Sequence, residues 1–123
     1  MSSPEKGPPA GVAAFTHLLA DFSGVAVSQL CDASLLSGLL IAAASGAGLT
    51  AIGPPLVRQR PDGGLGGILL LEQCHIAAHT VPARGLLLVD VLVPHAHEAR
   101  KAISIFARRF AATTLRLDDR TRG

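Results

Sequence analysis

The feature that most constrains the fold is a run of 25 residues, 33–57, without a single charged side chain. A run of this length could cross a bilayer as one helix. Several glycines, the pair Pro54 and Pro55, and four Ser or Thr residues interrupt it, however. We therefore expect a buried helix followed by a buried strand, and no membrane span.

The length and composition indicate one folded domain. The chain has 123 residues, of which 49% are hydrophobic and 16% are charged, against about 25% charged in an average soluble protein. This composition excludes global disorder, and the length suits a single hydrophobic core. Residues 1–12 are rich in Pro, Gly and Ser, so we expect a flexible N-terminal tail before a domain formed by residues 13–123.

The remaining composition argues against several classes of function. Four Phe and no Tyr or Trp leave few rings for stacking bases, so we expect no nucleic-acid binding. The seven basic residues from Arg100 onward fit a solvated helix face better than a phosphate-binding patch. Cys31 and Cys74 form no disulfide framework. No basic segment followed by an apolar core opens the sequence, so we expect a cytoplasmic protein.

Hydrophobic periodicity and turn residues predict eight elements. Strands are expected at residues 15–22, 49–59, 68–71, 75–81, 86–93 and 113–117, a turn at 60–67, and helices at 32–45 and 95–112. Asp32 is the expected N-cap of the first helix. The order strand, helix, four strands, helix, strand favours an α/β (α+β) fold with both helices on one face of a sheet.

The segment 72–82 (EQCHIAAHTVP) holds an unusual group of reactive side chains. If it is extended, His75 and His79 share one face of the strand and Cys74 lies on the other. A zinc site would draw on Cys74, His75, His79, His95 and His97. Nothing else in the sequence fixes four ligands, so we expect no metal and interpret the segment as a strand carrying polar side chains into a cleft.

Three segments of the chain resemble motifs of the small prokaryotic S-adenosylmethionine decarboxylases. These are 17–22 (HLLADF), 74–82 (CHIAAHTVP) and 89–91 (VDV), against H-L-x-A-[DE]-F, S-H-[IL]-x-x-H-T-[WY]-P-E and D-[ILV]-F-T-C-G in the family. Their order and spacing match across residues 16–117. The resemblance implies a two-layer sandwich with a mainly antiparallel sheet, which forms a homodimer sheet to sheet. It also implies a self-cleaving enzyme with a pyruvoyl cofactor, which decarboxylates its substrate for spermidine synthesis.

Part of the family's self-cleavage machinery is retained. The family's serine, which cleaves the chain before itself, falls on Cys74, and a thiol can attack the carbonyl of Gln73 to give a thioester. Elimination from the thioester then yields dehydroalanine, which hydrolyses to a pyruvoyl group. The histidine that assists elimination falls on His79, and Asp21 matches the acidic residue of the first strand. We interpret His75 as structural and Asp90 as a satisfied core carboxylate.

Other family positions have changed. The proton-donating cysteine falls on Pro94, which has no proton to give, and we assign its role to His95 or His97. In the expected substrate pocket, one aromatic falls on Val81, the glutamate that follows the motif proline falls on Ala83, and a second stacking aromatic falls near Arg60. The loop serine implicated in processing falls near Gly66. Most features that recognise adenosine are therefore missing.

These changes lead to two hypotheses. In the first, the chain is a diverged pyruvoyl-dependent decarboxylase acting on a smaller amino acid or a modified substrate, with the pyruvoyl group formed from Cys74. In the second, it is a non-processed, non-catalytic paralogue that acts as a ligand-binding or partner subunit. The expected partners are a small-molecule substrate and a second copy of the chain, or an active homologue in a heterodimer.

Overall fold

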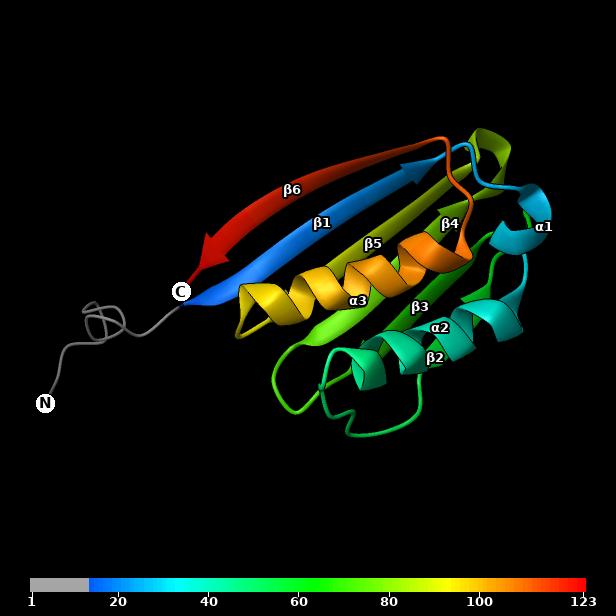
Figure 1. Ribbon diagram of the computed structural model, residues 1–123. Helices are drawn as coiled ribbons and strands as arrows, with labels where there is room; N and C mark the ends of the chain where they lie inside the picture. The colour runs from blue at the N-terminus through cyan, green and yellow to red at the C-terminus, as the bar shows by residue number, and fades with distance from the viewer. Residues whose placement is uncertain (1–13) are drawn as a thin grey trace, which may run out of the picture.

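One six-stranded sheet carries two long helices on a single face, as the computed structural model of residues 14–123 shows (Figure 1). The elements in chain order are β1 (Phe15–Ser23), α1 (Val27–Leu30), α2 (Ala33–Gly46), β2 (Leu56–Gln59), β3 (Leu65–Leu70), β4 (His75–Val81), the 3-10 turn η1 (Pro82–Arg84), β5 (Leu86–Val93), α3 (Ala96–Arg109) and β6 (Thr114–Arg122). The expected tail, residues 1–12, lies outside the described residues.

The strands lie in the order β2-β3-β4-β5-β1-β6, and every neighbouring pair is antiparallel. Alternation along β5 defines two faces. Leu87, Val89, Val91 and Val93 are buried beneath the helices, whereas Leu86, Leu88, Asp90 and Leu92 are half-buried on the opposite face. This arrangement confirms the α+β sandwich with both helices on one face. The opposite face has no covering layer among residues 14–123.

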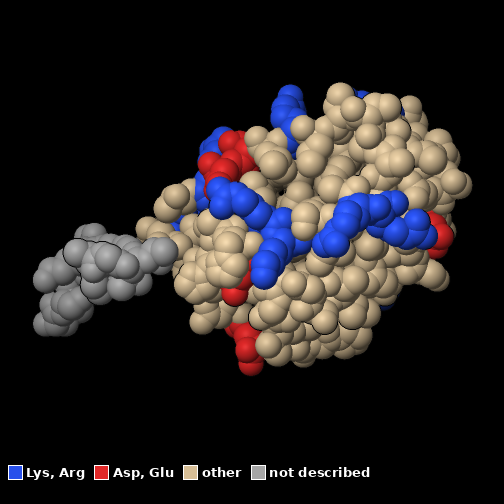
Figure 2. Space-filling view, in the orientation of Figure 1, with Lys and Arg blue, Asp and Glu red and all other residues tan. Residues whose placement is uncertain are grey.

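Both long helices follow their sequence signals. The Asp32 side chain accepts a hydrogen bond from the backbone N–H of Leu35 at 3.0 Å, which confirms it as the N-cap of α2. Apolar residues then recur on the inner face of each helix. In α2 these are Leu36, Leu39, Leu40, Ala43 and Ala44, and in α3 they are Ala99, Ala102, Ile103 and Phe106. The exposed Arg100, Lys101, Arg108 and Arg109 lie on the outer side of α3, in keeping with the expected solvated face (Figure 2).

The expected buried strand at residues 49–59 is wrong. Only Leu56–Gln59 forms β2, which is the edge strand and is mostly exposed. Pro54 and Pro55 have no N–H to donate to a neighbouring strand, so pairing before them is reduced to a single bridge between Ala51 and Leu71. Among the described residues, no helix is long and apolar enough to cross a membrane.

Other boundaries also differ from expectation: α3 ends at Arg109 and not at residue 112, and β3 and β6 are longer than predicted. The short helix α1 was not expected. β3 begins at Leu65, inside the segment expected to be a turn, and Gly67 allows α2 to approach closely. A Cβ on Gly67 would lie 3.1 Å from a methyl carbon of Leu40. β6 runs to Arg122 and not to residue 117, because β1 pairs with it over nine positions, from Phe15 opposite Arg122 to Ser23 opposite Thr114.

Candidate functional site

Cys74 lies in the tight turn between β3 and β4, where its carbonyl accepts a hydrogen bond from the N–H of Leu71 at 3.0 Å. Its φ angle is 76°, and among residues 14–123 it is the only residue other than glycine with a positive φ. The left-handed region costs a residue with a side chain about 1 to 3 kcal/mol. Backbone strain is therefore located at the position where the sequence predicts cleavage.

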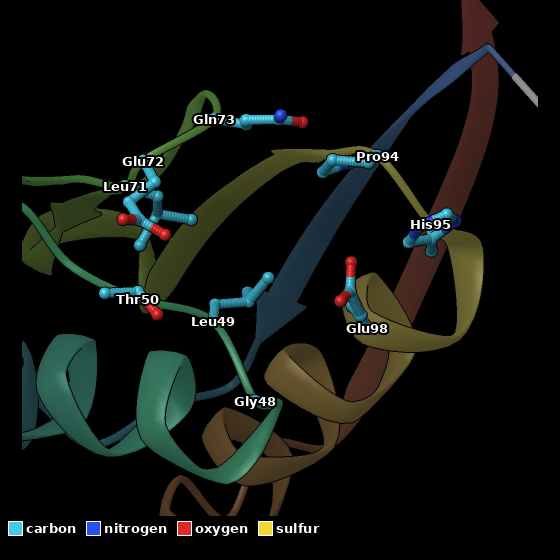
Figure 3. Close-up of a pocket in the computed structure, with 9 residues that line it drawn as sticks. All are labelled: Gly48, Leu49, Thr50, Leu71, Glu72, Gln73, Pro94, His95 and Glu98. Carbon is cyan, nitrogen blue, oxygen red and sulfur yellow. The ribbon is translucent and has the colours of Figure 1, made fainter.

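A pocket of about 260 Å³ opens beside this turn (Figure 3). It lies between the loop after α2, the β3–β4 turn and the start of α3, and its lining residues are Gly48, Leu49, Thr50, Leu71, Glu72, Gln73, Pro94, His95 and Glu98. The pocket thus brings together Gln73, Pro94 and His95, three of the positions singled out in the sequence. His97 does not line the pocket; its ring stacks on that of His95, with 6.2 Å between the ring centroids.

A second group of predicted site residues lies farther along β4, on the uncovered face of the sheet. Gly66 of β3 pairs with His79 of β4, and the same cross-strand row continues through Leu88 and Asp21 to Arg116. The Asp21 carboxylate accepts a hydrogen bond from Arg116 at 2.9 Å, and His79 is exposed. The row therefore presents an accessible imidazole that Leu88 separates from an ion pair.

The two groups are too far apart to work together within one chain. His75 and His79 are four residues apart on an extended strand, which corresponds to about 13 Å, and Cys74 is one residue farther away. Proton transfer requires contact at hydrogen-bond distance. A single chain therefore does not bring His79 to its own Cys74.

The residues expected to line a substrate pocket also lie away from the 260 Å³ pocket. Val81 ends β4, and Ala83 lies in the turn that follows it. The Arg60 guanidinium donates hydrogen bonds to the carbonyl oxygens of Leu65, at 3.2 Å, and Thr80. Arg60 therefore connects the loop before β3 to β4, and both terminal nitrogens of its guanidinium donate to backbone carbonyl oxygens.

A hydrogen-bonded cluster on the uncovered face joins one side chain from each of the three sequence motifs. His17 hydrogen-bonds through Nε2 to Oδ1 of Asp90, and Nε2 of His75 lies 3.5 Å from the same oxygen. Arg122 Nη1 lies 3.2 Å from Nδ1 of His17. Arginine can only donate, so Nδ1 accepts and Nε2 carries the proton directed at Asp90. Asp90 is hydrogen-bonded as expected of a satisfied carboxylate, but the prediction that it lies in the core is wrong, because its side chain is half-buried on the uncovered face.

Sequence reasoning missed His17 as a member of this cluster. Within residues 14–123, the cluster is the only close group of three or more possible metal ligands. The sequence-based set of Cys74, His75, His79, His95 and His97 is not gathered at one point. We interpret the cluster as structural, because His17 is hydrogen-bonded to Asp90 on one side and to Arg122 on the other and joins β1 to β5 and β6. The signal that could have revealed it is strand register, since His17 and His75 both lie opposite Leu92 of β5.

Comparison with known proteins gives consistent matches. The S-adenosylmethionine decarboxylase family matches residues 16–123. The S-adenosylmethionine decarboxylase proenzyme of Symbiobacterium thermophilum is 32% identical over 74 residues, which cover 60% of this chain and 55% of that protein. The proenzyme of Aquifex aeolicus is 39% identical over 75 residues, which cover 61% of this chain and 55% of the relative. The chain thus spans about half the length of the curated relatives it matches.

The solved structures give a longer match. The crystal structure of the adenosylmethionine decarboxylase from Aquifex aeolicus superposes with a TM-score of 0.84 at 28% sequence identity. The alignment covers 92% of this chain and 93% of that one. The similarity therefore extends over the sheet and both long helices.

Proposed function

Because the chain belongs to the S-adenosylmethionine decarboxylase family, we propose that it is a self-cleaving, pyruvoyl-dependent decarboxylase whose substrate is no longer S-adenosylmethionine. The observation that carries the proposal is the left-handed backbone of Cys74, at the position of the family's cleaving serine and beside a pocket lined by Gln73. A strained peptide next to a nucleophile favours attack on the preceding carbonyl, because the reaction releases the strain.

The cleavage chemistry uses groups that the chain itself supplies. The Cys74 thiolate attacks the carbonyl carbon of Gln73, the C–N bond breaks, and the acyl group passes from nitrogen to sulfur. A base then removes the Cα proton of residue 74, and the C–S bond breaks to leave dehydroalanine and a thiocarboxylate on Gln73. Dehydroalanine tautomerises to an imine, and water releases ammonia from it. The resulting pyruvoyl group supplies an electron sink for decarboxylation of an amino acid.

The base for elimination comes from a second copy of the chain. His79 lies too far from its own Cys74 to act on it, while the sheet face that carries His79 has no covering layer within residues 14–123. Leu86, Leu88 and Leu92 lie half-buried on this face and favour apolar contact with another protein surface. A homodimer packed sheet to sheet would cover them and carry the His79 of one protomer toward the Cys74 of its partner.

The altered substrate follows from the pocket lining. The nine lining residues include no Phe, Tyr or Trp, so the described part of the pocket offers no ring to stack on adenine. Its volume of about 260 Å³ is below the range of roughly 300 to 1,000 Å³ typical of sites for drug-sized ligands. A small amino acid fits these properties better than a nucleoside. His95, which lines the same pocket as Pro94, is the proposed proton donor in place of the family's cysteine.

A second function is favoured by two of the replaced residues. Pro94 removes the proton donor from the pocket, and Gly66 removes the processing serine from its place opposite His79. These changes would suit a non-processed subunit that supports an active homologue in a heterodimer.

Release of CO₂ distinguishes the two functions. Purified chain is incubated with S-adenosylmethionine and, separately, with each common L-amino acid, and the Cys74→Ala variant serves as the control. Release from a small amino acid, absent in Cys74→Ala and blocked by hydroxylamine, supports the proposed enzyme. Turnover of S-adenosylmethionine would contradict the altered substrate. Absence of release from every compound would favour the partner-subunit function.

A further inference from the structure

Glu98 contributes a carboxylate to the pocket beside Gln73, and one oxygen of that carboxylate is unpaired within residues 14–123. It is the third residue of α3, where a glutamate commonly accepts a hydrogen bond from the N-cap backbone and favours the positive end of the helix. Here its Oε1 is buried and has no hydrogen-bond partner among the described residues. Figure 3 shows the carboxylate projecting into the space below Pro94, between Leu49 and His95. A buried acceptor without a donor is costly, so this oxygen favours a ligand that supplies one.

The rest of the lining defines the kind of donor. Glu72 contributes a second carboxylate, and the nine residues from the described chain that line the pocket include no Lys or Arg. The two carboxylates therefore favour a cation beside them. Leu49, Leu71 and Pro94 supply apolar walls on the same pocket. A carboxylate next to apolar walls matches a cationic head joined to a short hydrocarbon chain.

We propose that this pocket binds a small organic ammonium ion, with the Glu98 carboxylate accepting a hydrogen bond from the ammonium group. The alkyl chain lies against Leu49, Leu71 and Pro94. A volume of about 260 Å³ holds a chain of a few carbon atoms. The inference goes beyond the proposed function, because binding requires neither cleavage at Cys74 nor a pyruvoyl group.

Three probes of nearly equal size and different charge test the proposal: n-butylammonium, 1-butanol and butanoate. Each is titrated into the ¹⁵N-labelled chain, and dissociation constants are obtained from the backbone amide shifts of Gly48, Thr50 and Glu98. We expect n-butylammonium to bind about tenfold or more tightly than the other two, as hydrogen bonds to a charged partner contribute that much. Equal binding of all three probes, or no saturable shift with n-butylammonium, would overturn the proposal.

Two matched variants locate the interaction. Glu98→Gln removes the pocket carboxylate, whereas Glu72→Gln makes the same chemical change at an exposed side chain of the same lining. We expect Glu98→Gln to weaken n-butylammonium binding about tenfold and Glu72→Gln to weaken it about threefold or less. Equal effects of the two variants would contradict a specific role for Glu98. Repeating the titration with Cys74→Ala separates binding from cleavage, and the three-probe comparison stands even if Glu98→Gln does not fold.

Discussion

Gly66 lies directly opposite His79 across the β3–β4 pair, and a Cβ on Gly66 would lie 3.3 Å from Nδ1 of the His79 ring. Any side chain at this position would therefore touch the imidazole. The resemblance to the S-adenosylmethionine decarboxylases implies a serine near this place, and a serine at position 66 itself would face the histidine with its hydroxyl. Its replacement by glycine leaves Nδ1 of His79 without a hydroxyl partner from β3.

Restoring this hydroxyl should accelerate cleavage between Gln73 and Cys74. The backbone of Gly66 is outside the left-handed region, so a serine is tolerated after a shift of a few tenths of an ångström by the His79 ring. We expect Gly66→Ser to raise the rate of fragment formation about tenfold or more, comparable with one added hydrogen-bond donor in an active site. Gly66→Ala adds the Cβ without the hydroxyl and should leave the rate near that of the wild type. Equal acceleration by both variants would assign the effect to packing and contradict the hydroxyl's role.

The strain at Cys74 predicts an order of stability between two uncleavable variants. Both Cys74→Gly and Cys74→Ala remove the thiol, but only glycine adopts a φ of 76° without steric cost. We expect the free energy of unfolding of Cys74→Gly to exceed that of Cys74→Ala by about 1 kcal/mol. Urea unfolding followed by circular dichroism measures this difference. Equal free energies of unfolding for the two variants would contradict backbone strain at residue 74.

The proposed sheet-to-sheet dimer would depend on apolar contact at the uncovered face. Leu88 lies half-buried at the middle of this face, in the cross-strand row that contains His79 and Asp21. Leu88→Arg should convert the dimer to a monomer, because it would bury an unpaired charge in the interface. Ile41→Arg makes the same kind of change on the exposed outer side of α2 and should leave the dimer intact. Light scattering after size exclusion gives the mass; a monomeric wild type would contradict the dimer.

Most of the fold could be predicted from local sequence signals. The alternating and apolar runs of β4 and β5, the Asp32 cap and the helical stripe of α3 each have a strong local pattern. The errors fall where long-range pairing decides the outcome. β6 is exposed at every position and mostly polar, and it acquires its length by pairing with β1. The apolar residues before Pro54 pair only through one bridge, because the prolines that follow them cannot donate to a neighbouring strand.

The candidate site could be predicted only in part. The sequence shows which side chains are reactive, but it does not show how far apart the fold places them. The sequence shows that Cys74 and His79 share a segment, but only the extended strand between them shows that they cannot meet in one chain. Glu98 was missed for a related reason. In the sequence it is an ordinary acidic residue of a helix's first turn, and its unpaired oxygen becomes visible only when the loop after α2 closes the pocket.

The measurement that tests the central claim most directly is the intact mass of freshly purified and of aged protein. The account predicts slow or partial cleavage into fragments 1–73 and 74–123, the second beginning with a pyruvoyl group. The first would end in a thiocarboxylate, heavier than a carboxylate by the difference between sulfur and oxygen, or in the carboxylate left when it hydrolyses. Cys74→Ala should remain whole. A wild-type chain that never splits, and ages as Cys74→Ala does, would contradict the pyruvoyl mechanism.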